Sequence, residues 1–180
     1  MSDHSTTIVP ALSAYPGKED KAKEILNWLV AEDIIKPTLS DCVLSASGGY
    51  AIAEGARAVI GSAKRGPFDL AVNGLEIVTE RQVFDTGGNG VEELICPSCD
   101  QDLAAEDWSF IDDWYQGHTN DVVCPVCNTA ADIHLFRFTP VWGFSDLGFR
   151  FWNLPDLTEA FINRFQQKLG CTVSVVYQRI

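Results

Sequence analysis

Two stretches of the chain repeat apolar residues at the spacing of an α-helix. In residues 18–32 the apolar positions are Ala22, Ile25, Leu26, Leu29 and Val30. In residues 155–169 they are Leu157, Phe161 and Phe165, with Pro155 suited to a first helical turn and Gly170 placed where a helix ends. Residues three or four apart lie on one face of a helix. Each stretch is therefore predicted to form an amphipathic helix that packs one face on a core.

Shorter apolar runs between turn residues predict β-strands. The expected strands are residues 6–12, 41–44, 68–72, 75–84, 92–95, 133–142, 149–152 and 172–177. Asn73-Gly74 suits the tight turn of a hairpin between two of these strands. Pro10 indicates an edge position or a bulge for the first strand, and the β-branched run at 172–177 is expected near the centre of a sheet. The run at 51–60 is compatible with a short helix or a strand.

The order of these elements predicts an α+β fold, in which a mainly antiparallel sheet has two main helices packed on it. A glycine-rich stretch at residues 87–90 is expected to be a flexible joint. We expect residues 1–90 and 133–180 to form a discontinuous α+β body. Residues 91–132 are expected to form an inserted subdomain with an internal helix at residues 104–115.

The insertion contains two Cys-Pro-x-Cys units. Cys96 and Cys99 belong to the first unit, and Cys124 and Cys127 to the second, with 24 residues between the units. Two cysteines three residues apart can direct both sulfurs at one ion from a tight turn. The pattern therefore predicts one four-thiolate metal site.

Each unit is followed by a residue that tolerates a positive φ angle, Asp100 in the first and Asn128 in the second. The two units resemble the zinc ribbon, a small module built from two cysteine knuckles on facing hairpins. They also resemble rubredoxin, whose four thiolates hold iron. The resemblance covers about residues 91–132. It implies a closed, structural Zn²⁺ site, with Fe, redox-active thiols or no bound metal as the alternatives.

The charges are distributed unevenly along the chain. Of 25 acidic residues, eleven lie between Arg81 and Arg137, an interval that has no Lys or Arg, and the other 14 are nearly balanced by 13 basic residues. Nucleic-acid affinity comes mostly from cations that neutralise phosphates, so the insertion is not expected to bind nucleic acid. A basic protein partner would be attracted instead. The alternative is that the acids only keep the insertion soluble.

The segment between the two units supplies the candidate partner-binding residues, which are Trp108, Asp112, Asp113 and Trp114. Trp is a favoured anchor in protein interfaces, and adjacent acids would attract a basic surface. The alternative is that these aromatic residues pack the insertion against the body.

No catalytic residue is assigned from the sequence. Four cysteines close the coordination shell of a metal ion, whereas a catalytic zinc keeps an open position. Cys42 and Cys171 are expected to be free thiols in a reducing compartment. An enzyme with a purely structural zinc is an alternative, and its cleft would be lined by polar groups such as Asp41, Tyr50 or Arg150.

The sequence has no run of 18 apolar residues that would predict a membrane span. Residues 1–10 lack the basic and apolar regions of a secretory signal, so we expect a cytoplasmic protein. Its expected function is non-enzymatic protein–protein interaction, as an adaptor or an immunity-type protein that masks a cationic target. Zinc would hold the acidic docking surface. Besides the enzyme with structural zinc, a rubredoxin-like electron carrier is an alternative. Nucleic-acid binding is a minor one, and it would need a basic face outside the insertion.

Overall fold

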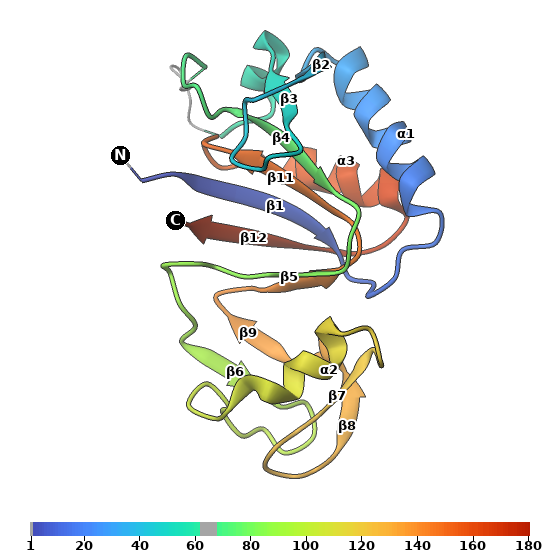
Figure 1. Cartoon of the computed structure of the whole chain (residues 1–180), viewed down its shortest axis with the longest axis vertical. Coiled ribbons are helices and arrows are strands. Elements are labelled where there is room, and N and C mark those ends of the chain that lie inside the picture. The colour runs from blue at the N-terminus through green and yellow to red at the C-terminus, as the bar shows by residue number, and fades with distance from the viewer. Residues whose placement is uncertain (1, 62–67) are drawn as a thin grey trace.

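A six-stranded antiparallel sheet forms the body of the protein. The computed structural model describes residues 2–61 and 68–180, and in it the strand order is β12-β1-β11-β4-β3-β2 (Figure 1). The strands are β1 (His4–Pro10), β2 (Ile35–Ser40), β3 (Gly49–Ile52), β4 (Gly74–Val78), β11 (Gly148–Trp152) and β12 (Val173–Arg179). Every neighbouring pair is antiparallel. The predicted α+β class with a mainly antiparallel sheet is confirmed.

Two helices pack on one face of this sheet, as predicted. They are α1 (Lys18–Ala31) and α3 (Glu159–Leu169). The rings of Trp28 and Phe165 join the two helices at a centroid distance of 5.2 Å, and Phe165 lies 5.3 Å from Phe149 of β11. The helices and the sheet therefore share one hydrophobic core. Among the described residues, no helix is long and apolar enough to cross a membrane.

Helix α3 begins later than predicted from Pro155, which was expected in its first turn. Thr158 caps α3, because its side-chain oxygen accepts a hydrogen bond from the backbone N–H of Phe161. The helix therefore starts four residues after Pro155. It ends at Gly170, whose φ of 69° is left-handed, as expected for a glycine that terminates a helix.

A smaller lobe lies beyond the opposite face of the sheet, at the bottom of Figure 1. We call residues 91–139 the cysteine lobe. Its elements are β6 (Glu93–Ile95), which pairs with β9 (Arg137–Thr139), β7 (Asp121–Val123), which pairs with β8 (Ala130–Asp132), and the short helix α2 (Asp112–Tyr115). A further pair, β5 (Gln82–Phe84) and β10 (Gly143–Ser145), lies between the lobe and the sheet. The described residues also form 3-10 helices at Glu54–Ala58, Trp108–Ile111 and Ile133–Leu135.

The hairpin predicted around Asn73 and Gly74 is wrong. Residues 68–72 form turns and bends, and β4 pairs with β3 and β11. Asn73 is buried, and its backbone N–H donates to the carbonyl oxygen of Cys42 at 2.9 Å. A Cβ on Gly74 would collide with Sγ of Cys42 and come within 2.9 Å of the carbonyl oxygen of Tyr50. Close packing, and not a turn, accounts for this glycine.

Four further strand predictions are wrong in position. Residues 75–84 divide into β4 and β5, which belong to two different sheets. Residues 41–44 form bends, and the strand β2 lies just before them. Residues 133–142 divide into a 3-10 helix and the short β9. The β-branched C-terminal strand β12 lies at an edge of the sheet, while β1 lies inside it. The ladder between β1 and β11 stops at Ile8, so the missing N–H of Pro10 leaves no gap in that pairing.

Residues 86–89 lie along the outer edge of β12. The backbone N–H of Gly88 donates to the carbonyl oxygen of Arg179 at 2.7 Å, and the N–H of Arg179 donates to the carbonyl oxygen of Thr86 at 3.3 Å. Nδ2 of Asn89 donates to the carbonyl oxygen of Tyr177 at 3.3 Å. The stretch that was expected to be a flexible joint is therefore hydrogen-bonded to the sheet edge.

Gly148 of β11 lies against the ring of Phe84 from β5. A Cβ on Gly148 would come 2.7 Å from Cε1 of that ring and closer still to Cζ. Phe84 is only 1% exposed, so its ring has little room to move away. We expect Gly148→Ala to lower the free energy of unfolding by about 1–3 kcal/mol, because overpacking forces the ring or the strand to shift.

The matched control for this change is Gly88→Ala, whose Cβ would meet nothing nearer than 3.5 Å. Denaturant titration should show a change within about 0.5 kcal/mol for the control. Equal stability of the two variants would contradict the tight contact between β5 and the sheet.

Candidate metal centre

The two Cys-Pro-x-Cys units form two turns with the same backbone hydrogen bonds. The N–H of Asp100 donates to the carbonyl oxygen of Cys96 at 3.1 Å, and the N–H of Asn128 donates to that of Cys124 at 2.9 Å. The N–H of each first cysteine also donates to the carbonyl oxygen five residues further on, at 3.1 Å and 3.0 Å. We call these turns the knuckles. Both therefore present their cysteines from the same local conformation.

The residue after each second cysteine has left-handed backbone, as predicted. The φ angle is 55° at Asp100 and 58° at Asn128. Asp and Asn are the non-glycine residues that tolerate this region best, so the knuckles close without glycine.

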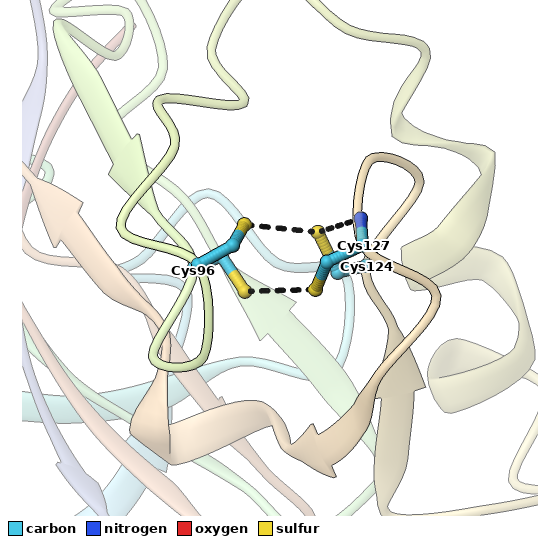
Figure 2. Close-up of side chains that lie close together, drawn as sticks. Cys96, Cys124 and Cys127 are labelled. Carbon is cyan, nitrogen blue, oxygen red and sulfur yellow. Dashed lines mark hydrogen bonds between the residues drawn. The ribbon is translucent and has the colours of Figure 1, made fainter.

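The knuckles face each other, and their four sulfurs converge (Figure 2). The Sγ atoms of Cys96, Cys99, Cys124 and Cys127 all lie within 4.8 Å of one another. Across the knuckles, Cys96 and Cys127 are 3.9 Å apart and Cys99 and Cys124 are 4.0 Å apart, sulfur to sulfur. A tetrahedral ion with metal–sulfur bonds of about 2.3 Å separates its sulfurs by about 3.8 Å, whereas a disulfide needs about 2.05 Å. The four cysteines are free thiols arranged to bind one metal ion.

Backbone N–H groups in both knuckles point at the sulfurs. Ser98 donates to Sγ of Cys96 at 3.4 Å. Val126 and Cys127 donate to Sγ of Cys124 at 3.4 Å and 3.5 Å. Four thiolates around a dication carry excess negative charge, and these donors offset part of it.

The second cysteines of the two knuckles have opposite pKa shifts. Thr129, through its side chain and its backbone, lowers the pKa of Cys127 to about 6. The backbone N–H of Gln101 favours the thiolate of Cys99, but burial and the three neighbouring thiols outweigh it and raise the pKa of Cys99 to about 12. One thiol therefore loses its proton near neutral pH while another keeps it. A bound dication would displace the remaining protons.

The segment between the knuckles is less helical than predicted. In residues 104–115 a 3-10 turn begins at Trp108, because Asp107 accepts a hydrogen bond from the backbone N–H of Ser109 at 2.9 Å. This turn leads directly into α2, which has only four residues. The aromatic spacing that predicted one long helix is thus divided between two short ones.

The predicted partner-binding residues in this segment differ in their exposure to solvent. Asp112 and Asp113 are exposed. Trp108 is half-buried, and Trp114 is 0% exposed, so its indole ring is not part of the surface. Tyr115, which the sequence did not single out, is 53% exposed beside the two acids. Helical spacing alone could not tell which aromatic residue points outward in such short helices.

Trp114 attaches the cysteine lobe to the body. Its indole Nε1 donates to Oγ of Ser13 at 2.8 Å, and its ring meets Phe144 edge-on at 5.3 Å. The guanidinium of Arg81 lies over the indole ring, 4.0 Å from its centre, and Arg81 also donates to the carbonyl oxygen of Thr119 at 2.9 Å. The one basic residue that borders the acidic interval on its N-terminal side is therefore used inside the joint.

His134 makes a second attachment between the lobe and β10. Its Nδ1 lies 2.7 Å from Oδ1 of Asp132, and its Nε2 lies 2.7 Å from the carbonyl oxygen of Phe144. A carbonyl oxygen can only accept, so Nε2 carries the hydrogen of that bond. The imidazole ring of His134 thereby connects the end of β8 to β10, which forms with β5 the strand pair between the lobe and the sheet.

Most acids of the lobe face solvent. The exposed ones are Glu92, Glu93, Asp100, Asp102, Glu106, Asp107, Asp112, Asp113 and Asp121. Within the described residues, none of these nine forms an ion pair with a Lys or Arg, and Asp113 lies 4.0 Å from a ring nitrogen of His118. The surface around the metal centre is therefore strongly anionic.

Polar residues proposed for an enzyme cleft do not gather at one place. Asp41 and Tyr50 line two neighbouring hollows, and the one at Tyr50 has a volume of about 310 Å³. Arg150 lines neither; it is buried and pairs with Glu76 at 3.4 Å. Cys42 is buried and Cys171 is half-buried, and both are free thiols outside the cluster.

Comparison of the chain with protein-family models, curated proteins and solved structures gave no match. The function is therefore inferred from the geometry and charge of the site.

His134 offers a test of the joint between the lobe and the body. We expect His134→Phe to lower the free energy of unfolding by about 1–3 kcal/mol, because it keeps a ring but leaves the carbonyl oxygen of Phe144 without its donor. The control is His118→Phe, since the His118 side chain is 72% exposed; it should change stability by less than about 0.5 kcal/mol. Thermal or denaturant unfolding would measure both. A loss confined to the His118 variant would refute the attachment.

Proposed function

We propose that the protein is a non-enzymatic interaction protein, an adaptor or an immunity-type inhibitor, in which structural zinc holds an acidic docking lobe for a basic protein partner. The observation that carries this proposal is the coincidence of a closed four-thiolate site with nine exposed acids that lack basic partners among the described residues. The metal would hold the lobe, and the acids would meet the partner.

Zinc is the metal best suited to the donor set. Sulfur-only tetrahedral sites favour zinc or iron, and structural zinc sites use four protein ligands. The spacing of the sulfurs, 3.9 Å and 4.0 Å across the knuckles, suits a zinc–sulfur tetrahedron. Structural zinc contributes on the order of 10–16 kcal/mol to small modules of this kind. The all-thiol arrangement of the six cysteines supports a reducing compartment such as the cytoplasm.

Two features favour a binding role over catalysis. Four sulfurs would fill the coordination shell of a zinc ion and leave no position for a substrate. The polar candidates elsewhere, Asp41, Tyr50 and Arg150, do not line one common cleft. If the metal only stabilises the fold of the lobe, the function of the lobe depends on its surface, which would bind the partner.

The charge of the lobe favours a protein over nucleic acid. Residues 91–139 hold Arg137 as their only Lys or Arg, so the lobe offers almost no cation to a phosphate backbone. An anionic surface attracts basic proteins and speeds their association. Asp112, Asp113 and the exposed Tyr115 combine acids with an aromatic side chain, a residue type enriched at interface centres.

Elemental analysis tests the metal. The purified protein should carry one zinc ion per chain and little iron, and Cys96→Ser should lose that zinc because it removes a fully buried ligand. Cys171→Ser should keep the zinc, since Cys171 lies outside the cluster. A red protein with iron in place of zinc would support the electron carrier instead.

Charge reversal tests the docking surface. Partners captured from a lysate of the native source would be purified and titrated against the protein. We expect Asp112→Lys/Asp113→Lys to weaken binding at least about tenfold, since like charges across an interface cost several kcal/mol. Added salt should weaken the wild-type complex, because salt screens exposed charges.

The matched control for the charge reversal is Glu19→Lys/Asp20→Lys. This pair is also exposed and also lies in the first turn of a helix, but on α1 of the body. The two variants have the same net charge, so a weaker complex with the control alone, or equal affinity with both, would contradict docking through the lobe. Zinc content would be measured in each variant to exclude loss of the fold.

A further inference from the structure

The four sulfurs of the cluster differ in their access to solvent. Cys96 and Cys124 are 0% exposed, whereas Cys99 and Cys127 are only partly buried. The second cysteine of each knuckle therefore faces outward, and the first faces the core of the lobe. The second cysteine of each knuckle is therefore more accessible to small molecules in solution than the first.

We propose that the cluster is also a redox switch, in which a small neutral peroxide oxidises the outward-facing sulfurs, expels the metal ion and opens the cysteine lobe. This inference depends on metal binding by the four cysteines and does not depend on the identity of any partner. It concerns Cys99 and Cys127 as the points of attack and Cys96 and Cys124 as the sulfurs that complete the disulfides.

Peroxide is the only oxidant that the conversion of the four thiolates to two disulfides requires. The thiolate of Cys99 or Cys127 attacks one peroxide oxygen, the O–O bond breaks, and a sulfenic acid and hydroxide form. A neighbouring thiolate then attacks the sulfenic sulfur, forms the S–S bond and releases a second hydroxide. The nearest measured partners lie across the knuckles, with Cys124 at 4.0 Å from Cys99 and Cys96 at 3.9 Å from Cys127. Two peroxide molecules thus oxidise all four thiolates, and the dication leaves because no thiolate remains to hold it.

The acids of the lobe select the oxidant by charge. Asp100 directly follows Cys99, and it and Asp102 are exposed next to the first knuckle. A neutral peroxide approaches this surface without penalty, whereas an anionic disulfide such as oxidised glutathione is repelled. The repulsion is electrostatic and should decline as salt is added. The switch would therefore respond to peroxide and resist the glutathione pool.

Expulsion of the metal would be transmitted to the joint with the body. The sulfurs of Cys96 and Cys124 belong to the same buried cluster as Trp114 and Phe144. Trp114 in turn contacts Arg81 and Ser13 of the body. A lobe that opens would expose this indole, so tryptophan fluorescence reports on the joint independently of the metal.

The experiment uses the full chain loaded with one zinc ion, verified before the assay. Two equivalents of hydrogen peroxide are added, released zinc is measured with a chromogenic chelator, and tryptophan fluorescence is followed in parallel. Sulfenic acids are trapped with dimedone and located by peptide mass spectrometry. We expect loss of the zinc, a red shift of the emission and first labelling at Cys99 or Cys127. Reduction with added zinc should restore both signals.

The oxidant selectivity is tested with oxidised glutathione at low and high salt. At low salt it should release zinc at least about tenfold more slowly than peroxide does, and added salt should narrow the difference. Asp100→Asn keeps a residue that tolerates left-handed backbone and should speed the reaction with oxidised glutathione, but not with peroxide. Asp41→Asn removes the same charge from an exposed position on the body and should change neither rate.

Three results would overturn the proposal. Zinc that stays bound while peroxide oxidises Cys171, the half-buried free thiol, would show that the cluster is protected. First labelling at Cys96 or Cys124 would refute attack from the solvent side. Release by oxidised glutathione as fast as by peroxide at low salt would refute selection by charge.

Discussion

The convergence of four sulfurs is the constraint on which the cysteine lobe depends. Two turns separated by 24 residues must bring all four Sγ atoms within 4.8 Å of one another, on a surface where nine acids repel each other. The shared hydrogen bonds of the knuckles and the left-handed angles at Asp100 and Asn128 fix the backbone of each knuckle in a conformation that suits metal binding. An ion at the centre would join the two halves. Because four thiolates and a dication together carry excess negative charge, the free energy of metal binding must outweigh the repulsion between this centre and the acids, so metal, charge and fold are coupled in this lobe.

The contacts between lobe and body come from distant parts of the chain. Ser13 follows β1, Arg81 precedes β5, and the carbonyl of Phe144 belongs to β10. Each of these contacts meets the lobe at Trp114 or His134, on either side of the second knuckle. The lobe is thus held at its base by the same layer that covers the sheet, while the knuckles lie toward the far end (Figure 1). This arrangement leaves the acids of the lobe facing solvent.

The sequence predicted the parts of this structure that depend on local chemistry. Helical spacing identified α1 and α3, and the paired cysteines identified the cluster together with the positive φ of the residues that follow it. Predictions failed where distant packing decides. Gly74 was interpreted as a turn residue, but it faces Cys42, which only the folded sheet brings near. The same limit applies to β12, because β-branched residues suit any half-buried strand and do not specify its place in the sheet. The burial of Trp114 also depends on Ser13 and Arg81, which no local pattern connects to it.

The loop on β12 has a consequence for the behaviour of the protein at high concentration. A strand at the rim of a sheet presents open peptide groups that can recruit strands from other molecules and start aggregation. Gly88, Asn89 and Thr86 occupy such groups on Arg179 and Tyr177. Intermolecular sheet extension is therefore hindered over the C-terminal half of this strand. A chain with exposed Tyr177 and Ile180 gains protection from fibre-like association through the backbone of Thr86 and Gly88 and the side chain of Asn89.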